Sequence, residues 1–120
     1  MAKTILIVED NFINRTMFRD VLQASGYETI ESVDGKDTLQ LAREHQPDLI
    51  LMDVQLPEGD GLEYTKMLKA DEALKHIPVI VVTATLPEKE KEIRESGCDG
   101  YLAKPITIPT FLETVAKHIK

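Results

Sequence analysis

Acidic side chains follow two apolar segments of the sequence at the point where each segment ends. Glu9 and Asp10 come directly after an apolar run at residues 5–8, and Asp53 follows another at residues 49–52. If these runs are neighbouring parallel strands, their carboxyl ends meet in one crevice and three carboxylates converge there. At separations of ~5 Å and an effective dielectric of ~20, each ionised pair repels by roughly 3 kcal/mol. A divalent cation reverses this repulsion, and hard oxygen ligands open to solvent suit Mg²⁺.

Each acid also has an ordinary structural use. Asp10 can cap the helix that follows it, and Asp53 can accept hydrogen bonds in a turn before Pro57. Two further residues strengthen the functional interpretation: Thr83 ends another apolar run, and Lys104 follows the last predicted strand. A hydroxyl donor and a positive point charge are what a phosphoryl group needs opposite a metal ion. The combination predicts a Mg²⁺-dependent phosphoryl site.

Five segments have the composition of β-strands. Three apolar runs lack polar alternation, which is typical of parallel strands buried on both faces, whereas two mixed runs suit flanking or edge positions. Apolar residues recur three or four positions apart between these runs, which predicts helices. The alternation predicts a flavodoxin-like, doubly wound α/β fold, with a five-stranded parallel sheet of order 2-1-3-4-5 and five helices in three layers. The predicted strands are residues 5–8, 27–31, 49–52, 79–82 and 100–103.

The predicted helices have recognisable ends. Asp34 can cap the second helix, and Asp60 can cap the third, with Glu63 three residues later as in a capping box. Gly26 and Gly97 follow helical stretches, where a residue in the left-handed conformation is needed.

The fourth helix, at about residues 86–96, is the weakest predicted element. The run at residues 88–95 contains a single apolar residue, and Leu86-Pro87 interrupts the approach to it. Pairs such as Glu90 with Arg94 stabilise a helix by only ~0.3 kcal/mol each. We therefore expect a mobile or displaced helix with little packing against the sheet.

Length and composition limit the classes of protein to consider. The chain has 120 residues, 42% of them hydrophobic and 29% charged, which suits one domain over residues 1–120 without an output domain. No apolar stretch approaches the ~20 residues that span a bilayer, and a formal net charge of -7 opposes binding to nucleic acid or to membrane surfaces. The single cysteine, Cys98, excludes an internal disulfide and suits a reducing, cytoplasmic setting. We expect a cytoplasmic monomer.

The acidic, hydroxyl and basic residues together form a longer pattern. Over essentially the whole chain, this pattern resembles that of the CheY-like receiver domains of bacterial response regulators. The matching motifs are Glu9-Asp10, Asp53-x-x-Leu56-Pro57-x-x-x-Gly61, Thr83-Ala84 and Lys104-Pro105.

The resemblance implies a role for each site residue. Asp53 would accept a phosphoryl group from a phosphohistidine on a histidine kinase or a histidine phosphotransferase. Asp10 and Asp53 would bind Mg²⁺ directly, together with the backbone carbonyl of Gln55, while Glu9 would hold the ion mainly through water. Lys104 would pair with the phosphoryl oxygens, which agrees with the need for charge neutralisation in phosphoryl transfer.

The resemblance also implies a switch and a cis peptide bond. Thr83 would hydrogen-bond the phosphoryl group, and Tyr101 would turn inward into the space that Thr83 leaves, which changes the binding of a downstream protein effector. From the sequence alone, Tyr101 is an ordinary half-exposed strand aromatic. The Lys104–Pro105 bond is expected to be cis. A single-domain regulator in a phosphorelay is implied, with cell-cycle control among the roles of similar proteins.

Two other classes of function compete with the signalling switch. Phosphatases and phosphotransferases of the haloacid-dehalogenase type also use an aspartate nucleophile, but they typically carry a second aspartate two residues later, where this chain has Gln55. A flavodoxin-like mononucleotide binder needs a phosphate cradle after the first strand, where this chain has the acidic loop beginning at Glu9. We therefore favour a switch that is not an enzyme, apart from slow phosphotransfer to itself and slow loss of the phosphoryl group.

Overall fold

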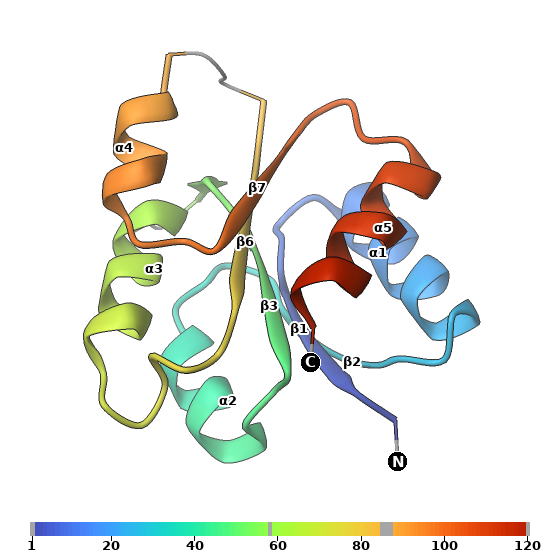
Figure 1. The fold of residues 1–120 in the computed structure, drawn as a ribbon, viewed down its shortest axis with the longest axis horizontal. Coiled ribbons are helices and arrows are strands. Elements are labelled where there is room, and N and C mark those ends of the chain that lie inside the picture. The colour runs from blue at the N-terminus through green and yellow to red at the C-terminus, as the bar shows by residue number, and fades with distance from the viewer. Residues whose placement is uncertain (1, 58, 85–87, 120) are drawn as a thin grey trace.

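A five-stranded parallel sheet forms the centre of the molecule (Figure 1). The computed structural model describes residues 2–57, 59–84 and 88–119. The strand order is β2-β1-β3-β6-β7, which confirms the predicted order 2-1-3-4-5 once two short additional strands are counted in the numbering. The strands are β1 (Thr4–Val8), β2 (Glu28–Ser32), β3 (Leu49–Asp53), β6 (Val79–Thr83) and β7 (Gly100–Ala103).

Helices cover both faces of this sheet and complete the three layers (Figure 1). In the described part of the chain, α1 (Phe12–Ala24) and α5 (Ile108–His118) lie on one face. The other face carries α2 (Thr38–His45), α3 (Gly61–Ala70) and α4 (Glu90–Glu95). The alternation of side chains along each strand divides the core into two clusters. Leu6 and Ile50 point to the α2–α3–α4 side, whereas Ile5 and Leu51 point to the α1–α5 side.

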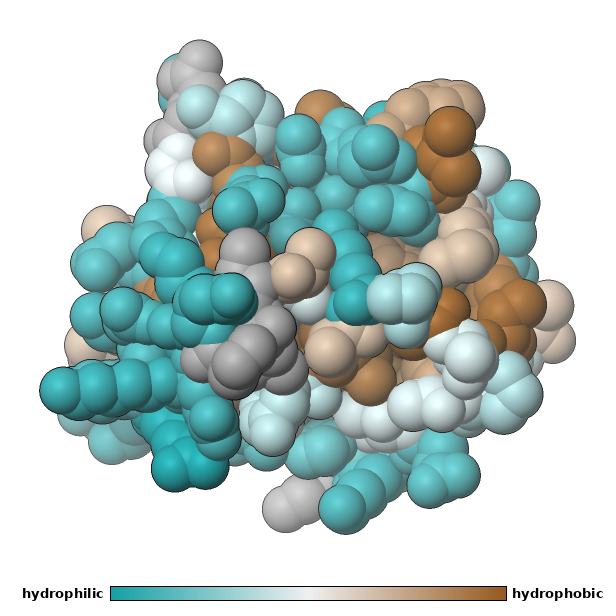
Figure 2. All heavy atoms as spheres, turned by 90° about the horizontal axis from the view of Figure 1, so that it is seen from above, coloured by the Kyte–Doolittle hydropathy of each residue, from teal (hydrophilic) through white to brown (hydrophobic). Residues whose placement is uncertain are grey.

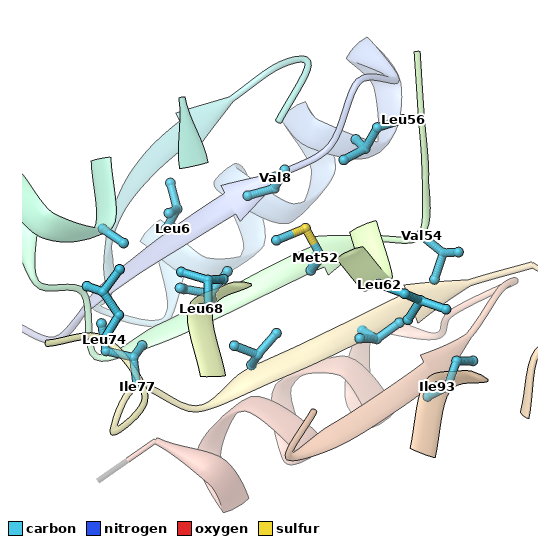
Figure 3. Packing of buried hydrophobic residues seen from close by; sticks show 14 residues of the cluster. Leu6, Val8, Met52, Val54, Leu56, Leu62, Leu68, Leu74, Ile77 and Ile93 are labelled. Carbon is cyan, nitrogen blue, oxygen red and sulfur yellow. The ribbon is translucent and has the colours of Figure 1, made fainter. Parts of the chain in front are cut away.

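Both clusters are built from large apolar side chains. On the α1–α5 side, the rings of Phe18 and Phe111 stack with their centroids 4.9 Å apart and join the two helices. On the opposite side, Met52 of β3 packs in one cluster with Leu62 and Leu68 of α3 (Figure 3). Since β1, β3 and β6 are buried on both faces, their carboxyl ends are held at fixed positions.

The segment after β3 contains structure that the sequence pattern did not predict. β4 (Gln55–Leu56) and β5 (Gly59–Asp60) form a two-stranded antiparallel pair before α3 begins. Each strand has only two residues, which is too short for a hydrophobic period.

The predicted helix ends are partly confirmed. Asp60 caps α3, because the Leu62 amide donates to its Oδ1 at 2.8 Å, and Gly26 and Gly97 have φ values of 93° and 85°. The prediction for Asp34 is wrong.

The helix α2 begins after Asp37 rather than after Asp34. Asp34 Oδ1 instead accepts a hydrogen bond from the Lys36 amide at 3.0 Å. The physical reason is the turn at Gly35, which has a φ of 87° and separates Asp34 from the first turn of the helix. Asp37 makes no side-chain capping hydrogen bond, since its Oδ1 accepts from the Ser32 hydroxyl.

The helix α4 is short but is anchored to the core. Arg94 and Glu90 form the expected ion pair. The expectation of little packing is wrong, because Ile93 is 1% exposed and belongs to the same buried cluster as Leu62 (Figure 3). Ile93 is the one buried residue of α4, so this side chain connects the helix to the core. Leu86-Pro87 lies outside the described residues, and mobility of α4 stays a prediction.

Candidate functional site

Three carboxylates meet at the carboxyl ends of β1 and β3. The two strands pair in parallel, with Val8 opposite Met52, so the residues that follow them leave the sheet side by side. Glu9, Asp10 and Asp53 each offer one oxygen, and these oxygens lie within 4.8 Å of one another. Strand pairing thus brings together three acids that are far apart in the sequence.

Burial makes this cluster electrostatically costly. Glu9 is 1% exposed and Asp53 is 6% exposed, whereas Asp10 lies nearer to solvent. Burial, and then the negative charge of Glu9, raise the pKa of Asp53 from 3.8 to about 7, while Lys104 acts in the opposite direction. Without a further cation, the cluster therefore holds a proton near neutral pH.

Lys104 supplies a positive charge to this cluster. Its Nζ lies 3.5 Å from Glu9 Oε1 and 3.5 Å from Asp53 Oδ1. The Lys104 amide donates to the carbonyl of Thr83 at 2.8 Å, which ties the residue after β7 to the end of β6. The Lys104–Pro105 peptide bond is cis, the isomer that the family resemblance implied.

A cleft of about 400 Å³ opens above the acids. Thr83, which is 1% exposed, and Gln55 line it together with the carboxylates and Lys104. Tyr101 does not line the cleft, because it lies on β7 with 47% of its surface exposed. The remaining lining residues are Asn11, Asn14, Val54, Leu56, Pro57 and Ala84.

Hydrogen bonds of Asn11 organise the loop from β1 to α1. Asn11, not Asp10, caps α1, since Asn11 Oδ1 accepts from the Asn14 amide at 2.9 Å. The Asn11 amide donates to Glu9 Oε2 at 3.2 Å. The capping role considered for Asp10 is thereby excluded, and its carboxylate faces the cluster.

The loop from β3 to α3 approaches the backbone of Asp53 very closely. The Gly61 amide donates to the carbonyl of Val54 at 2.8 Å. A Cβ at Gly61 would lie 1.9 Å from the carbonyl oxygen of Asp53, so only glycine fits there. This contact and the β4–β5 pair fix the position of the Gln55 backbone beside Asp53.

Sequence reasoning missed two residues that shape this site. Asn14 lines the cleft one helical turn after Asp10, a spacing that could have indicated its position. Arg15 donates from Nη1 to the carbonyls of Glu9 and Asp10, at 3.1 and 3.2 Å. Nothing in the sequence pattern indicates that an arginine folds back onto the preceding loop.

Apolar side chains are exposed at the starts of α1 and α5. Phe12 and Ile13 of α1 are 68% and 76% exposed, and Ile108 of α5 is 48% exposed. Figure 2 looks down on the end of the molecule where β1 and β3 finish, and apolar side chains gather on the side where α1 and α5 lie. Within the described residues, no helix is both long and apolar enough to cross a membrane.

Two curated proteins are similar in sequence to this chain over nearly its whole length. The polar-differentiation response regulator DivK of Brucella ovis is 56% identical over 120 residues, which cover 99% of this chain and 98% of that protein. DivK of Brucella anthropi is 55% identical over the same shares of the two chains.

Solved structures agree in fold. The chemotaxis protein CheY4 of Vibrio cholerae is 32% identical with a TM-score of 0.92, over 99% of this chain and 100% of that one. The receiver domain of a sensor histidine kinase from Pseudomonas aeruginosa PAO1 is 31% identical, with a TM-score of 0.91 over 98% of both chains. That domain has a magnesium ion coordinated in its active-site cleft.

The family itself follows from the match of the sequence to the response regulator receiver domain over residues 5–116. With the fold and the strand-end site described above, the chain belongs to the response regulator receiver domains, the signalling proteins of two-component systems.

Proposed function

We propose that Asp53 accepts a phosphoryl group from a phosphohistidine on a histidine kinase or a histidine phosphotransferase. The observation that supports this proposal is the meeting of three carboxylates and Lys104 in one cleft at the strand ends. Phosphoryl transfer asks a protein mainly for positioning and charge neutralisation, and these groups supply both.

Mg²⁺ is the cation that this donor set fits. The ligand atoms are carboxylate oxygens within 4.8 Å of one another, and the cleft of about 400 Å³ leaves space for water and for a phosphoryl group. Asp10 and Asp53 would bind the ion directly with the backbone carbonyl of Gln55, and Glu9 would hold it through water. When bound, the ion neutralises negative charge on the phosphoryl oxygens.

The transfer is a displacement at phosphorus. An ionised oxygen of Asp53 forms the new O–P bond while the P–N bond of the phosphohistidine breaks, and the electron pair of that bond returns to the imidazole nitrogen. Lys104, now 3.5 Å from Asp53 Oδ1, is close enough to pair with the transferred group. The product is an acyl phosphate on Asp53, which this chain hydrolyses only slowly and without turnover of other phosphoesters.

The phosphoryl group would act as a switch for protein binding. Thr83 lines the cleft, and β6 pairs with β7, which carries Tyr101. A hydrogen bond from Thr83 to the phosphoryl group would make room for Tyr101 to turn inward and change the surface offered to an effector. Coupling of ~1–3 kcal/mol, equivalent to ~5–150-fold in partner affinity, is typical for two linked sites.

The name of the DivK relatives supports a role in cell polarity and division for this chain. We also propose that this receiver works as a cytoplasmic monomer, since a single cysteine, Cys98, suits a reducing setting. The exposed side chains of Phe12, Ile13 and Ile108 are then contacts for a partner protein. The acidic net charge disfavours nucleic acid as that partner.

The test of this function is labelling by acetyl phosphate. The wild type should gain the mass of one phosphoryl group in the presence of Mg²⁺, whereas Asp53→Asn should not. Asp20→Asn, which removes an exposed acid on α1, is the matched control and should be labelled like the wild type. Labelling of Asp53→Asn, or rapid turnover of an external phosphoester by the wild type, would refute the proposal.

A further inference from the structure

One arginine is folded back against the loop that carries two of the acids. Arg15 lies in the first turn of α1, and its amide donates to the carbonyl of Asn11 at 2.9 Å. Its Nη1 reaches the carbonyl oxygens of Glu9 and Asp10, at 3.1 and 3.2 Å. The side chain is only 15% exposed, although the residue stands on a surface helix. The guanidinium thus bridges two successive peptide groups of the loop.

Contacts on other sides hold this guanidinium in place. Arg15 Nε lies 3.5 Å from Glu31 Oε1, and Glu31 belongs to β2, the strand on the other side of β1 from β3. The ring of Phe12 lies 5.7 Å from the guanidinium carbon, within the range of a cation–π contact. The arginine is therefore anchored to the sheet and to α1 in addition to its contacts with the loop.

The bridged carbonyls belong to the residues whose carboxylates point into the cleft. Fixing both peptide groups restricts the backbone rotation that would otherwise swing the side chains of Glu9 and Asp10 apart. Partners that orient metal ligands in this way commonly change metal affinity by ~10–100-fold when they are removed. Arg15 holds the carbonyl oxygens and leaves the carboxylate oxygens available.

We propose that Arg15 is a positioning residue, which holds the Glu9–Asp10 loop in the geometry that binds the metal ion. This inference rests on the proposed function, because it concerns the Mg²⁺ site of that function. A positive charge placed beside a cation site would by itself weaken Mg²⁺ binding. Removal of the arginine should therefore weaken Mg²⁺ binding if Arg15 positions the loop, and should strengthen Mg²⁺ binding if only its charge matters.

The experiment measures Mg²⁺ affinity by titration calorimetry at constant pH and ionic strength. Arg15→Met should weaken binding by ~10-fold, equivalent to ~1.4 kcal/mol. Arg15→Lys keeps the charge but loses the planar guanidinium, which contacts both carbonyls through Nη1 and Glu31 through Nε, so it should weaken binding by a smaller factor. If Arg15→Met does not fold, Arg15→Lys distinguishes positioning from charge. A pure charge effect would leave the Mg²⁺ affinity of Arg15→Lys equal to that of the wild type.

Two control variants separate positioning from charge and from general stability. Arg43→Met removes an arginine that pairs with Asp71 on the far side of the sheet, and Val115→Ala opens a cavity in α5. Both should bind Mg²⁺ within twofold of the wild type. In acetyl phosphate labelling, Arg15→Met should raise the half-saturating Mg²⁺ concentration by ~10-fold while the rate at saturating Mg²⁺ changes little.

The outcomes separate this inference from the function on which it rests. Unchanged or tighter Mg²⁺ binding by Arg15→Met, or an equal loss in Val115→Ala, would overturn the positioning role while leaving phosphorylation of Asp53 intact. A wild type that neither binds Mg²⁺ nor is labelled would overturn the proposed function, and the positioning role with it.

Discussion

The substitution Asp53→Asn should stabilise the metal-free protein at neutral and alkaline pH. Burial and the charge of Glu9 raise the pKa of Asp53 from 3.8 to about 7. Between about pH 4 and pH 7, the unfolded chain has lost this proton while the folded chain keeps it, so the free energy of unfolding falls as the pH rises through this window. Asparagine carries no charge to desolvate and escapes this loss.

The expected stabilisation by Asp53→Asn follows from the raised pKa of Asp53. A difference of about three pKa units corresponds to ~4 kcal/mol, at ~1.4 kcal/mol for each unit. Local relaxation and water entry reduce the cost of a buried charge, so we expect about half of this, ~2 kcal/mol, as the gain in Asp53→Asn. With a urea m value of ~2 kcal/mol/M, the unfolding midpoint at pH 8 should rise by ~1 M in Asp53→Asn.

Urea unfolding in EDTA, followed by far-UV circular dichroism because the chain has no tryptophan, measures this difference. The wild type and Asp53→Asn should have similar stabilities near pH 4 and separate as the pH rises to 8. Mg²⁺ in tenfold excess over its Kd should stabilise the wild type by ~1.4 kcal/mol and leave Asp53→Asn much less affected. Equal stability of the two proteins at pH 8, or a wild type indifferent to Mg²⁺, would show that the acids do not repel one another as described.

Three further substitutions test other parts of the site and the fold. Gly61→Ala places a Cβ 1.9 Å from the Asp53 carbonyl, so it should destabilise the protein by ~1–3 kcal/mol in urea unfolding and reduce labelling; wild-type behaviour would mean that the loop yields easily. Lys104→Ala removes the cation that lowers the pKa of Asp53, so that pKa should move above 7 in carbon-13 NMR titrations of the metal-free protein. A pKa that stays in place would contradict the contact. Ile93→Ala empties the only buried position of α4, so it should cost ~2–5 kcal/mol in urea unfolding or speed amide exchange in α4 selectively.

The sheet and its order could be predicted from the sequence because they depend on composition that is visible along the chain. Apolar runs such as 49–52 have no polar alternation, and this pattern has one simple explanation, burial on both faces. The acids at the strand ends then followed from the strand order. Three observed strands, β1, β3 and β6, are one residue longer than predicted, whereas β2 is shifted by one residue and β7 has the predicted bounds.

Features that depend on single contacts could not be predicted in this way. α4 was expected to pack weakly because it has one apolar residue, yet Ile93 is buried, and periodicity cannot indicate the depth of a single side chain. Asp34 was placed at the start of α2 from its residue type, whereas the turn at Gly35 moved that helix start. Arg15 was not considered, because its contacts are with backbone carbonyls and leave no charge pattern in the sequence.

The placement of the two basic side chains suits the proposed use of one acidic cluster for both a metal ion and a phosphoryl group. Lys104 reaches the carboxylates of Glu9 and Asp53 from the end of β7, on a flexible stem that can follow a new anion. Arg15 contacts the opposite side of the loop, where it meets carbonyls and is fixed by Glu31. In the proposed function, Lys104 would follow the phosphoryl group from the cleft, while Arg15 would hold the Glu9–Asp10 loop in place.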